Sequence, residues 1–263
     1  MLLKLFPKEK MQRKNKKGQA MIWVFVAILI VAGIAMLFLF VKGPGLLTQT
    51  EFEPKSYIEK CVRKSTNDAI DIMLPQGGFI APRNYKTYYG KNAAYLCENI
   101  GYFAPCISQH PMLLNEMKKE ITNYTSPEIE QCFSDLKKEL EKRDNSVVYG
   151  STLLNVSLGP DRVYVDVIKR ISITKGENTQ SFDNIRVEII SPLYDLGSVA
   201  IEIASQEAKY CYFEYVGYML LYPRFDIQKF AFGDSTKIYT IKDKNTDKEM
   251  NIAIRSCAIP PGL

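Results

Sequence analysis

One uninterrupted apolar segment, Ala20–Val41, limits the architecture of this chain more than any other feature. It contains 22 consecutive residues without a charge, and a hydrocarbon core of about 30 Å requires roughly 20 helical residues. A helix buried in a water-soluble domain rarely stays free of charge for that length. The segment therefore predicts one membrane-spanning helix, with Gly33 tolerated because lipid offers the helical backbone no competing hydrogen-bond partner.

The charges that flank this segment predict its orientation. Residues 1–18 contain seven basic residues and one acidic residue, a net charge of +6, whereas residues 42–263 contain 27 basic and 28 acidic residues. Positive flanks stay on the cytoplasmic side, so we expect the N-terminus inside and the C-terminal domain outside the cell. The net charge of +5 comes entirely from this flank. We therefore expect contact with the lipid bilayer and no binding of nucleic acid.

Two alternatives to a permanent anchor involve cleavage of the leader. A secretory signal has a shorter apolar core, about 7–15 residues, and a small-residue cleavage site that residues 42–45 do not provide. The junction Lys16-Lys17-Gly18-Gln19-Ala20 resembles the class III signal peptide of archaeal type IV pilins. That resemblance implies cleavage between Gly18 and Gln19 and self-assembly through the apolar helix. The chain departs from the pattern at Trp23, where many pilins have Glu.

The part of the chain beyond the apolar segment carries a second resemblance. It is similar to uncharacterised single-pass membrane proteins of small-genome archaea. The likeness rests on the turn Gln76-Gly77-Gly78-Phe79-Ile80, on the closing segment Ala253-Ile254-Arg255-Ser256-Cys257, and on Pro260-Pro261-Gly262. It implies a single-pass arrangement and brings no activity with it.

All six cysteines lie after the apolar segment, which predicts disulfides formed in an oxidising compartment. A zinc site would need closer cysteine pairs, and free buried thiols are the other alternative. Six cysteines allow 15 pairings. Cys61 and Cys132 occur in nearly the same context, Ile-Glu-Lys-Cys and Ile-Glu-Gln-Cys, each after a proline that opens a predicted helix. Our hypothesis pairs Cys61 with Cys132, Cys97 with Cys106, and Cys211 with Cys257.

Hydrophobic periodicity predicts an α+β fold. The predicted divisions are a basic cytoplasmic segment (1–19), the membrane helix (20–41), a linker (42–54), a helical cysteine-containing subdomain (55–145) and an α+β subdomain (146–263). Helices are expected at 55–74, 92–100, 111–124 and 193–221, with another that takes Ser126 as its N-cap and Pro127 at its first position. Strands at 147–158, 162–174 and 182–190 form an expected antiparallel meander, followed by strands at 225–232, 237–242 and 250–257.

No pattern predicts catalysis, a metal or a cofactor. His110 is the only histidine, and no nucleophile elbow, zinc-binding His-Glu-x-x-His, phosphate loop or dinucleotide glycine pattern accompanies it. We expect His110 to lie at the start of a helix and the protein not to be an enzyme. Asn123-Tyr124-Thr125 and Asn155-Val156-Ser157 are acceptor sequons for N-glycosylation in an exported chain.

A concentration of aromatic residues within a predicted loop, residues 79–109, is the candidate binding site. Its members are Tyr85, Tyr88, Tyr89, Tyr95, Tyr102 and Phe103. Exposed rings supply rigid contact area for a glycan or a surface protein, although the same rings can simply cap neighbouring helices. The predicted function is a structural or adhesive surface protein. The alternatives are a pilin-like subunit matured after Gly18 and an extracytoplasmic enzyme or ligand-binding receptor.

Overall fold

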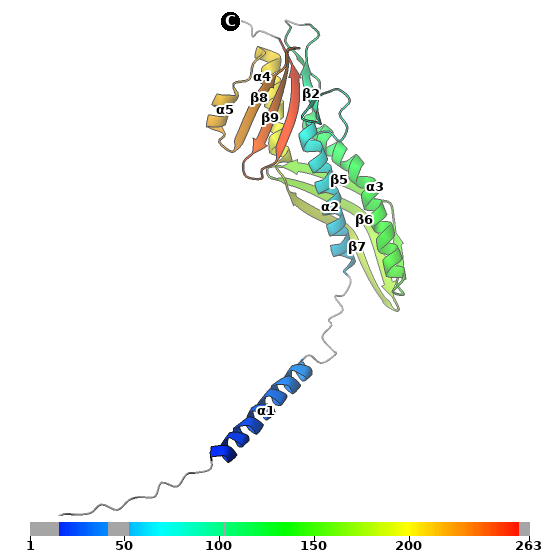
Figure 1. Cartoon of the computed structure of the whole chain (residues 1–263). Coiled ribbons are helices and arrows are strands. Elements are labelled where there is room, and N and C mark those ends of the chain that lie inside the picture. The colour runs from blue at the N-terminus through cyan, green and yellow to red at the C-terminus, as the bar shows by residue number, and fades with distance from the viewer. Residues whose placement is uncertain (1–15, 42–52, 102–103, 258–263) are drawn as a thin grey trace, which may run out of the picture. The chain divides into compact units, whose positions relative to one another are not determined.

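The computed structural model describes residues 16–41, 53–101 and 104–257 (Figure 1). The chain forms two compact units, Met1–Phe52 and Glu53–Leu263. The first unit contains α1 (Lys16–Val41), whose side chains are described from residue 23 to residue 37, and all of these are exposed. Over the described side chains, no helix combines the length and the apolar character that a membrane crossing requires.

The second unit contains two sheets, and the larger one is mixed. Its strand order is β1-β2-β10-β9-β8, with the short β3 attached to β2. The strands are β1 (Tyr85–Tyr88), β2 (Lys91–Glu98), β3 (Ile107–Ser108), β8 (Phe225–Ala231), β9 (Thr236–Asp243) and β10 (Glu249–Arg255). Only the β10–β2 pair is parallel among these neighbours. This sheet combines strands from before and after residue 145, where the sequence analysis divides the subdomains.

The smaller sheet is the expected antiparallel meander with one strand interrupted. Its strands are β4 (Ser146–Tyr149), β5 (Leu153–Gly159), β6 (Arg162–Lys175) and β7 (Asn178–Ile190). The predicted strand 147–158 is divided into β4 and β5, and both halves pair with β6, whose other edge pairs with β7. Together the two sheets and the helices confirm the predicted α+β class.

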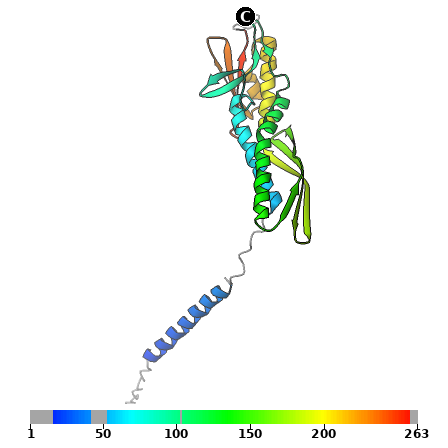
Figure 2. The ribbon, with the colours of Figure 1, turned by 90° about the vertical axis from the view of Figure 1, so that its right-hand side faces the viewer.

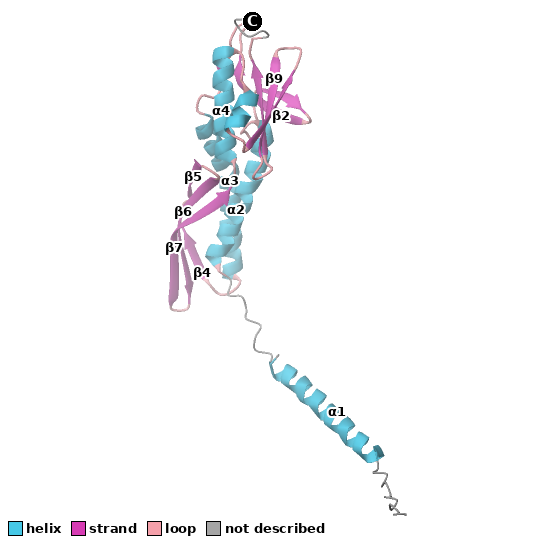
Figure 3. Cartoon of the chain, turned by 90° about the vertical axis from the view of Figure 1, so that its left-hand side faces the viewer, coloured by secondary structure: helices cyan, strands magenta, loops and turns pink. Residues whose placement is uncertain are grey.

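Two long helices, α2 (Pro54–Met73) and α3 (Leu113–Glu141), pack side by side and cover the smaller sheet (Figure 2). Apolar residues of α2 recur every three or four positions and are buried, as are those of α3. The short helix η1 (Leu74–Gln76) extends α2 toward β10 and β2, while α4 (Leu193–Tyr210) lies against the larger sheet (Figure 3). The core therefore continues from one sheet to the other along these helices.

The three hypothesised disulfides are all present in the structure. Cys61–Cys132 joins α2 to α3 with a Cα–Cα distance of 6.5 Å. Cys97–Cys106 connects the end of β2 to the segment before β3, at 5.4 Å between Cα atoms. Cys211–Cys257 joins the end of α4 to the residues after β10, at 5.5 Å. The described residues include no free cysteine.

The predicted helix 92–100 is wrong, because this segment is the strand β2. Residues Ala93–Cys97 are all buried between β1 on one side and β10 on the other. A short continuous apolar run suits a strand buried on both faces as well as a helix, so periodicity alone does not separate them. The predicted loop before it is the β1–β2 hairpin, which turns at Tyr89 and Gly90 with φ values of 45° and 74°.

The predicted break at Ser126-Pro127 is also wrong, because α3 runs through both residues. Ser126 does not cap a helix; its hydroxyl donates to the Thr122 carbonyl one turn back, at 2.6 Å. Thr125 donates in the same way to Ile121, at 2.8 Å. The buried face continues across the proline from Ile121 to Ile129. Packing on α2 and the small sheet therefore overrides a local sequence signal for a new helix.

The single helix expected at 193–221 is instead two helices, α4 and α5 (Tyr215–Leu221). Cys211 ends α4 in the left-handed conformation, with φ of 53°, and its disulfide fixes it there. The Glu214 carboxylate then accepts a hydrogen bond from the Gly217 N–H at 3.3 Å and caps α5. The long helical pattern did not reveal this break because its apolar residues continue across it.

Arg224 joins the two sheets through three aspartates. Its Nε donates to the Asp243 carboxylate of β9 at 2.6 Å, and a terminal nitrogen donates to Asp161 of the β5–β6 turn at 2.6 Å. Asp195, in the first turn of α4, lies 3.6 Å from the same guanidinium. The Asp243 side chain is fully buried. Hydrogen bonding to Asp243 raises the pKa of Arg224, so this cation stays charged.

We expect Arg224→Ala to destabilise the protein by about 3–5 kcal/mol, because it leaves the buried Asp243 carboxylate without its partner. Arg170→Ala is the control, since Arg170 and its partner Asp183 are both exposed, and it should cost less than about 1 kcal/mol. Urea unfolding monitored by circular dichroism gives both values. Equal, small effects of the two substitutions would contradict this role of Arg224.

Candidate functional site

The structure separates the predicted aromatic residues into exposed and buried groups. Tyr85 and Tyr88 lie on β1, and Tyr89 lies in the hairpin turn with 88% of its surface exposed. Tyr95 is buried on β2. Tyr102 and Phe103 lie outside the described residues. The hairpin thus brings Tyr88 and Tyr89 to the surface and takes Tyr95 out of any direct contact with a large partner.

Tyr88 and Tyr89 meet two phenylalanines from a distant part of the chain, and we call these four residues the aromatic face. Phe230 lies on β8, and Phe232 lies in the β8–β9 connection. The ring centroids of Tyr88 and Tyr89 are 4.5 Å apart, those of Tyr88 and Phe230 are 5.7 Å apart, and those of Phe230 and Phe232 are 4.9 Å apart. The sequence analysis missed both phenylalanines because β1 and β8 lie at opposite edges of the sheet, and the approach of their side chains in the folded chain is not visible in a linear pattern.

Buried residues of the larger sheet support the aromatic face. Ala93, Ile238 and Ala253 are buried, and Tyr88 and Phe232 pack against them. Helix α4 contacts β2, β9 and β10, and its buried Glu207 is paired with Lys237 and Tyr239 of β9. Because Tyr239 and Ile238 are neighbours on a strand, their side chains point to opposite faces of the sheet. The aromatic face is therefore on the side away from α4.

A polar network borders the aromatic face. Lys86 binds Asp234 at 2.7 Å, and its ammonium lies 4.4 Å from the centre of the Phe232 ring. Burial opposes ionisation of Asp234, but hydrogen bonds from Lys86 and Thr236 outweigh that effect and lower the pKa of the carboxyl to about 2. The Tyr95 hydroxyl lies 3.0 Å from the Thr236 hydroxyl and accepts a hydrogen bond from Arg255 at 3.0 Å. These contacts hold β1 and the start of β9 in place beside the aromatic face.

Two titratable groups elsewhere, His110 and Glu207, form structural pairs. His110 lies directly before α3, and its Nδ1 is 2.6 Å from Glu116. The buried Glu207 of α4 accepts hydrogen bonds from Tyr239 and from Lys237, which links the helix to β9. Burial and Glu207 raise the pKa of Tyr239. Among the described residues, no group of three or more Cys, His, Asp or Glu side chains is placed to hold a metal ion.

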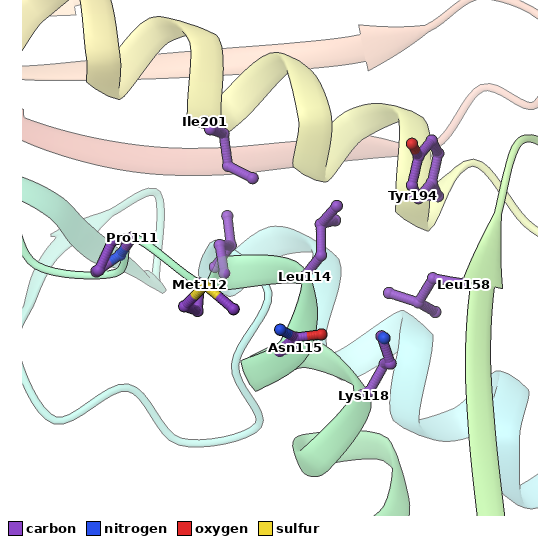
Figure 4. Close-up of a pocket in the computed structure, with 9 residues that line it drawn as sticks. Pro111, Met112, Leu114, Asn115, Lys118, Leu158, Tyr194 and Ile201 are labelled. Carbon is purple, nitrogen blue, oxygen red and sulfur yellow. The ribbon is translucent and has the colours of Figure 1, made fainter.

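An apolar cavity of about 270 Å³ lies between the start of α3, α4 and the end of β5 (Figure 4). Met112 and Leu114 come from the α3 side, Ile201 and Tyr194 come from α4, and Leu158 comes from β5. Lys118 is the only charged residue in its lining. Lys118 and Asn115 do not form an acid and base pair, so the cavity offers mostly apolar contact.

The two sequons lie on exposed positions. Asn123 is exposed on α3, and Asn155 is exposed on β5, opposite Asp166 of β6. Gly18 and Gln19 lie within α1, but their exposure falls outside what the structure describes.

No family model matches this chain, and no curated protein or solved structure matches it either. The function must therefore be argued from the chain's own surfaces and from its organisation.

We expect a carbon NMR titration of the Asp234 carboxyl to give a midpoint near pH 2. The pKa is lowered on folding, so this group's contribution to stability is complete above about pH 4 and is lost as the pH falls toward 2. In Lys86→Met the midpoint should rise toward about 3.9. Lys242→Met, which removes an ion pair with Asp247, should leave it unchanged. A wild-type midpoint near 3.9 would contradict the Lys86–Asp234 pair.

Proposed function

We propose that this chain is a single-pass membrane protein that displays a disulfide-tied α+β domain at the cell surface, in a structural or adhesive role. The observation that carries the proposal is the distribution of residues around Ala20–Val41. Seven basic residues precede this uncharged segment, and all six cysteines follow it. Insertion of this segment into a membrane is expected to have two consequences. Positive charge keeps the N-terminus inside, and the cysteines are oxidised outside.

The exposed apolar surface of α1 supports an anchor. Its described side chains are apolar around the whole helix, and those of Trp23, Leu29 and Val31 are each at least 67% exposed. Apolar surface in water costs about 25 cal/mol per Å², so a helix of this kind requires lipid or another apolar partner. The uncharged sequence of 22 residues has the length that lipid requires.

The aromatic face is the recognition surface that we propose for this domain, and a surface protein is the partner it favours. The rings of Phe230 and Phe232 are inclined at 79°, and those of Tyr88 and Tyr89 at 66°. A sugar ring stacks best on a flat aromatic platform, whereas inclined rings with spaces between them suit the irregular side chains of a protein. Lys86 and Asp234 at the border add polar groups of both signs.

The pilin-like alternative is favoured by one observation, the Lys17-Gly18-Gln19 junction directly before the apolar segment. Cleavage after Gly18 would give a mature chain that begins with the apolar helix. That helix could then pack against copies of itself instead of lipid. Both proposals place the second unit outside the cell and differ in the N-terminus of the mature chain.

Protease added to intact cells should digest the second unit and leave a protected fragment that contains α1, because the lipid bilayer and the cytoplasm shield residues before the linker. The fragment is identified by mass spectrometry, with lysed cells as the control, in which the basic segment is also digested. A second unit that remains intact on intact cells would contradict the proposed topology. The same fragment separates the two proposals: it begins at Met1 in an unprocessed anchor and at Gln19 in a pilin-like subunit.

Substitution of the aromatic face should weaken adhesion to cells. We expect Phe230→Ala and Tyr89→Ala, in the full chain held in lipid nanodiscs, to reduce retention on intact cells about tenfold each, since central aromatic contacts carry most of the energy of an interface. Tyr85→Ala is the matched control, an exposed tyrosine on the same hairpin that contacts none of the four rings.

If Tyr85→Ala and Tyr89→Ala reduce retention on cells equally, at unchanged thermal stability, the aromatic face has no specific role in adhesion. In a second test, glycans are removed enzymatically from the cell surface while the surface proteins stay in place. Loss of retention after this treatment would show that the partner is a carbohydrate and would contradict a protein partner.

A further inference from the structure

A polar cleft of about 450 Å³ lies between the segment 79–84, β2 and the first turns of α3. It is separate from the aromatic face and from the apolar cavity of Figure 4, with which it shares no lining residue. Its charged lining consists of Arg83, His110, Glu116, Lys119 and Glu120. Its volume falls in the range of about 300–1,000 Å³ that is typical of small-molecule sites.

The Gln76–Ile80 turn, which contributes Phe79 to the cleft wall, is held against α3. The Gln76 amide donates to the Ile80 carbonyl at 2.9 Å and to the Ile72 carbonyl at 3.1 Å. Gly78 has φ of 96°, and a Cβ there would lie 2.9 Å from Met117 of α3. Only glycine permits this conformation and this approach. The cleft is therefore preformed, which lowers the entropic cost of binding a ligand.

The carboxylates that line the cleft already have partners, whereas two of its cations do not. Glu116 contacts His110 at 2.6 Å, and Glu120 accepts a hydrogen bond from the Ile80 N–H at 3.0 Å. Arg83 and Lys119 form no ion pair or hydrogen bond with any described residue. One comes from the segment 79–84 and the other from α3, so the two walls of the cleft each provide a free positive charge. This arrangement favours an anionic ligand.

Two amide side chains define what else the ligand must offer. The Asn84 amide nitrogen donates to Glu98 at 2.6 Å, and the Gln109 amide nitrogen donates to the Ile107 carbonyl at 3.0 Å. Each side chain therefore retains its oxygen as an acceptor and its second N–H as a donor. A hydroxyl group both donates and accepts, so it matches either amide, whereas a bare anion would leave both amide oxygens unused.

We propose that this cleft binds a small hydroxylated carboxylic acid of the uronic acid type. Its carboxylate lies between Arg83 and Lys119, and its hydroxyl groups donate to the oxygens of Asn84 and Gln109. This proposal goes beyond the anchoring and adhesive role, because it concerns a different surface and holds whichever way the leader is processed.

The test is calorimetric titration of the full chain in lipid nanodiscs with glucuronate, glucose and acetate. The protein is exported into an oxidising compartment of a host that does not N-glycosylate, because Asn123 also lines the cleft. Glucuronate should bind saturably, and glucose and acetate should each bind at least about tenfold more weakly, since each offers only part of the required chemistry. Arg83→Ala and Lys119→Ala should each weaken glucuronate binding by about tenfold.

Lys118→Ala is the matched control, since Lys118 precedes Lys119 on α3 but lines the apolar cavity instead of the cleft. It should leave glucuronate binding unchanged. The proposal is overturned if glucuronate does not bind, if acetate binds as tightly as glucuronate, or if Lys118→Ala weakens binding as much as Lys119→Ala. The binding measurements do not depend on protease accessibility. A failure of glucuronate to bind would therefore leave the proposed topology standing, and a failed topology test would leave the proposed ligand standing.

Discussion

The pairing of α2 with α3 is the arrangement on which the rest of the second unit depends. The two helices bury their apolar faces against each other and are joined by Cys61–Cys132. Helix α2 continues through η1 to β10 and β2, while α3 contacts β4, β5 and α4. The smaller sheet thus packs directly on this pair of helices, and the larger sheet is connected to it through η1 and α4. A disulfide that closes a loop of this length typically contributes about 2–4 kcal/mol, chiefly by restricting the unfolded chain.

Sequence periodicity and cysteine context predicted much of this fold. The α+β class, α2 and the meander are confirmed, and each follows from a local pattern. All three disulfides are confirmed as well: matching contexts suggested Cys61–Cys132, and the other two pairs were assigned to the cysteines that remained. The errors share one cause, which is that tertiary contacts override local signals. Buried β2 has the composition of a short helix, Ser126-Pro127 carries capping residues inside a continuous helix, and the disulfide at Cys211 ends α4 where its apolar pattern continues.

The candidate sites were predictable only in part for a similar reason. Tyr88 and Tyr89 were identified because they are close in sequence, but Phe230 and Phe232 join them only through tertiary packing, which no local pattern encodes. The cleft beside His110 likewise combines the segment 79–84 with α3. The aromatic face offers inclined rings for a large partner, and the cleft offers two free cations for a small acidic one. The two surfaces share none of their defining residues, so the domain displayed in the proposed topology can use both at once.

The most direct test of the central claim, export of a disulfide-tied domain, is peptide mapping of the protein from its native membrane without reduction, after alkylation of free thiols. The account predicts no alkylated cysteine and three linked peptides, which join Cys61 to Cys132, Cys97 to Cys106, and Cys211 to Cys257. Alkylated cysteines in the native protein, or a peptide that links Cys61 to Cys97, would contradict it.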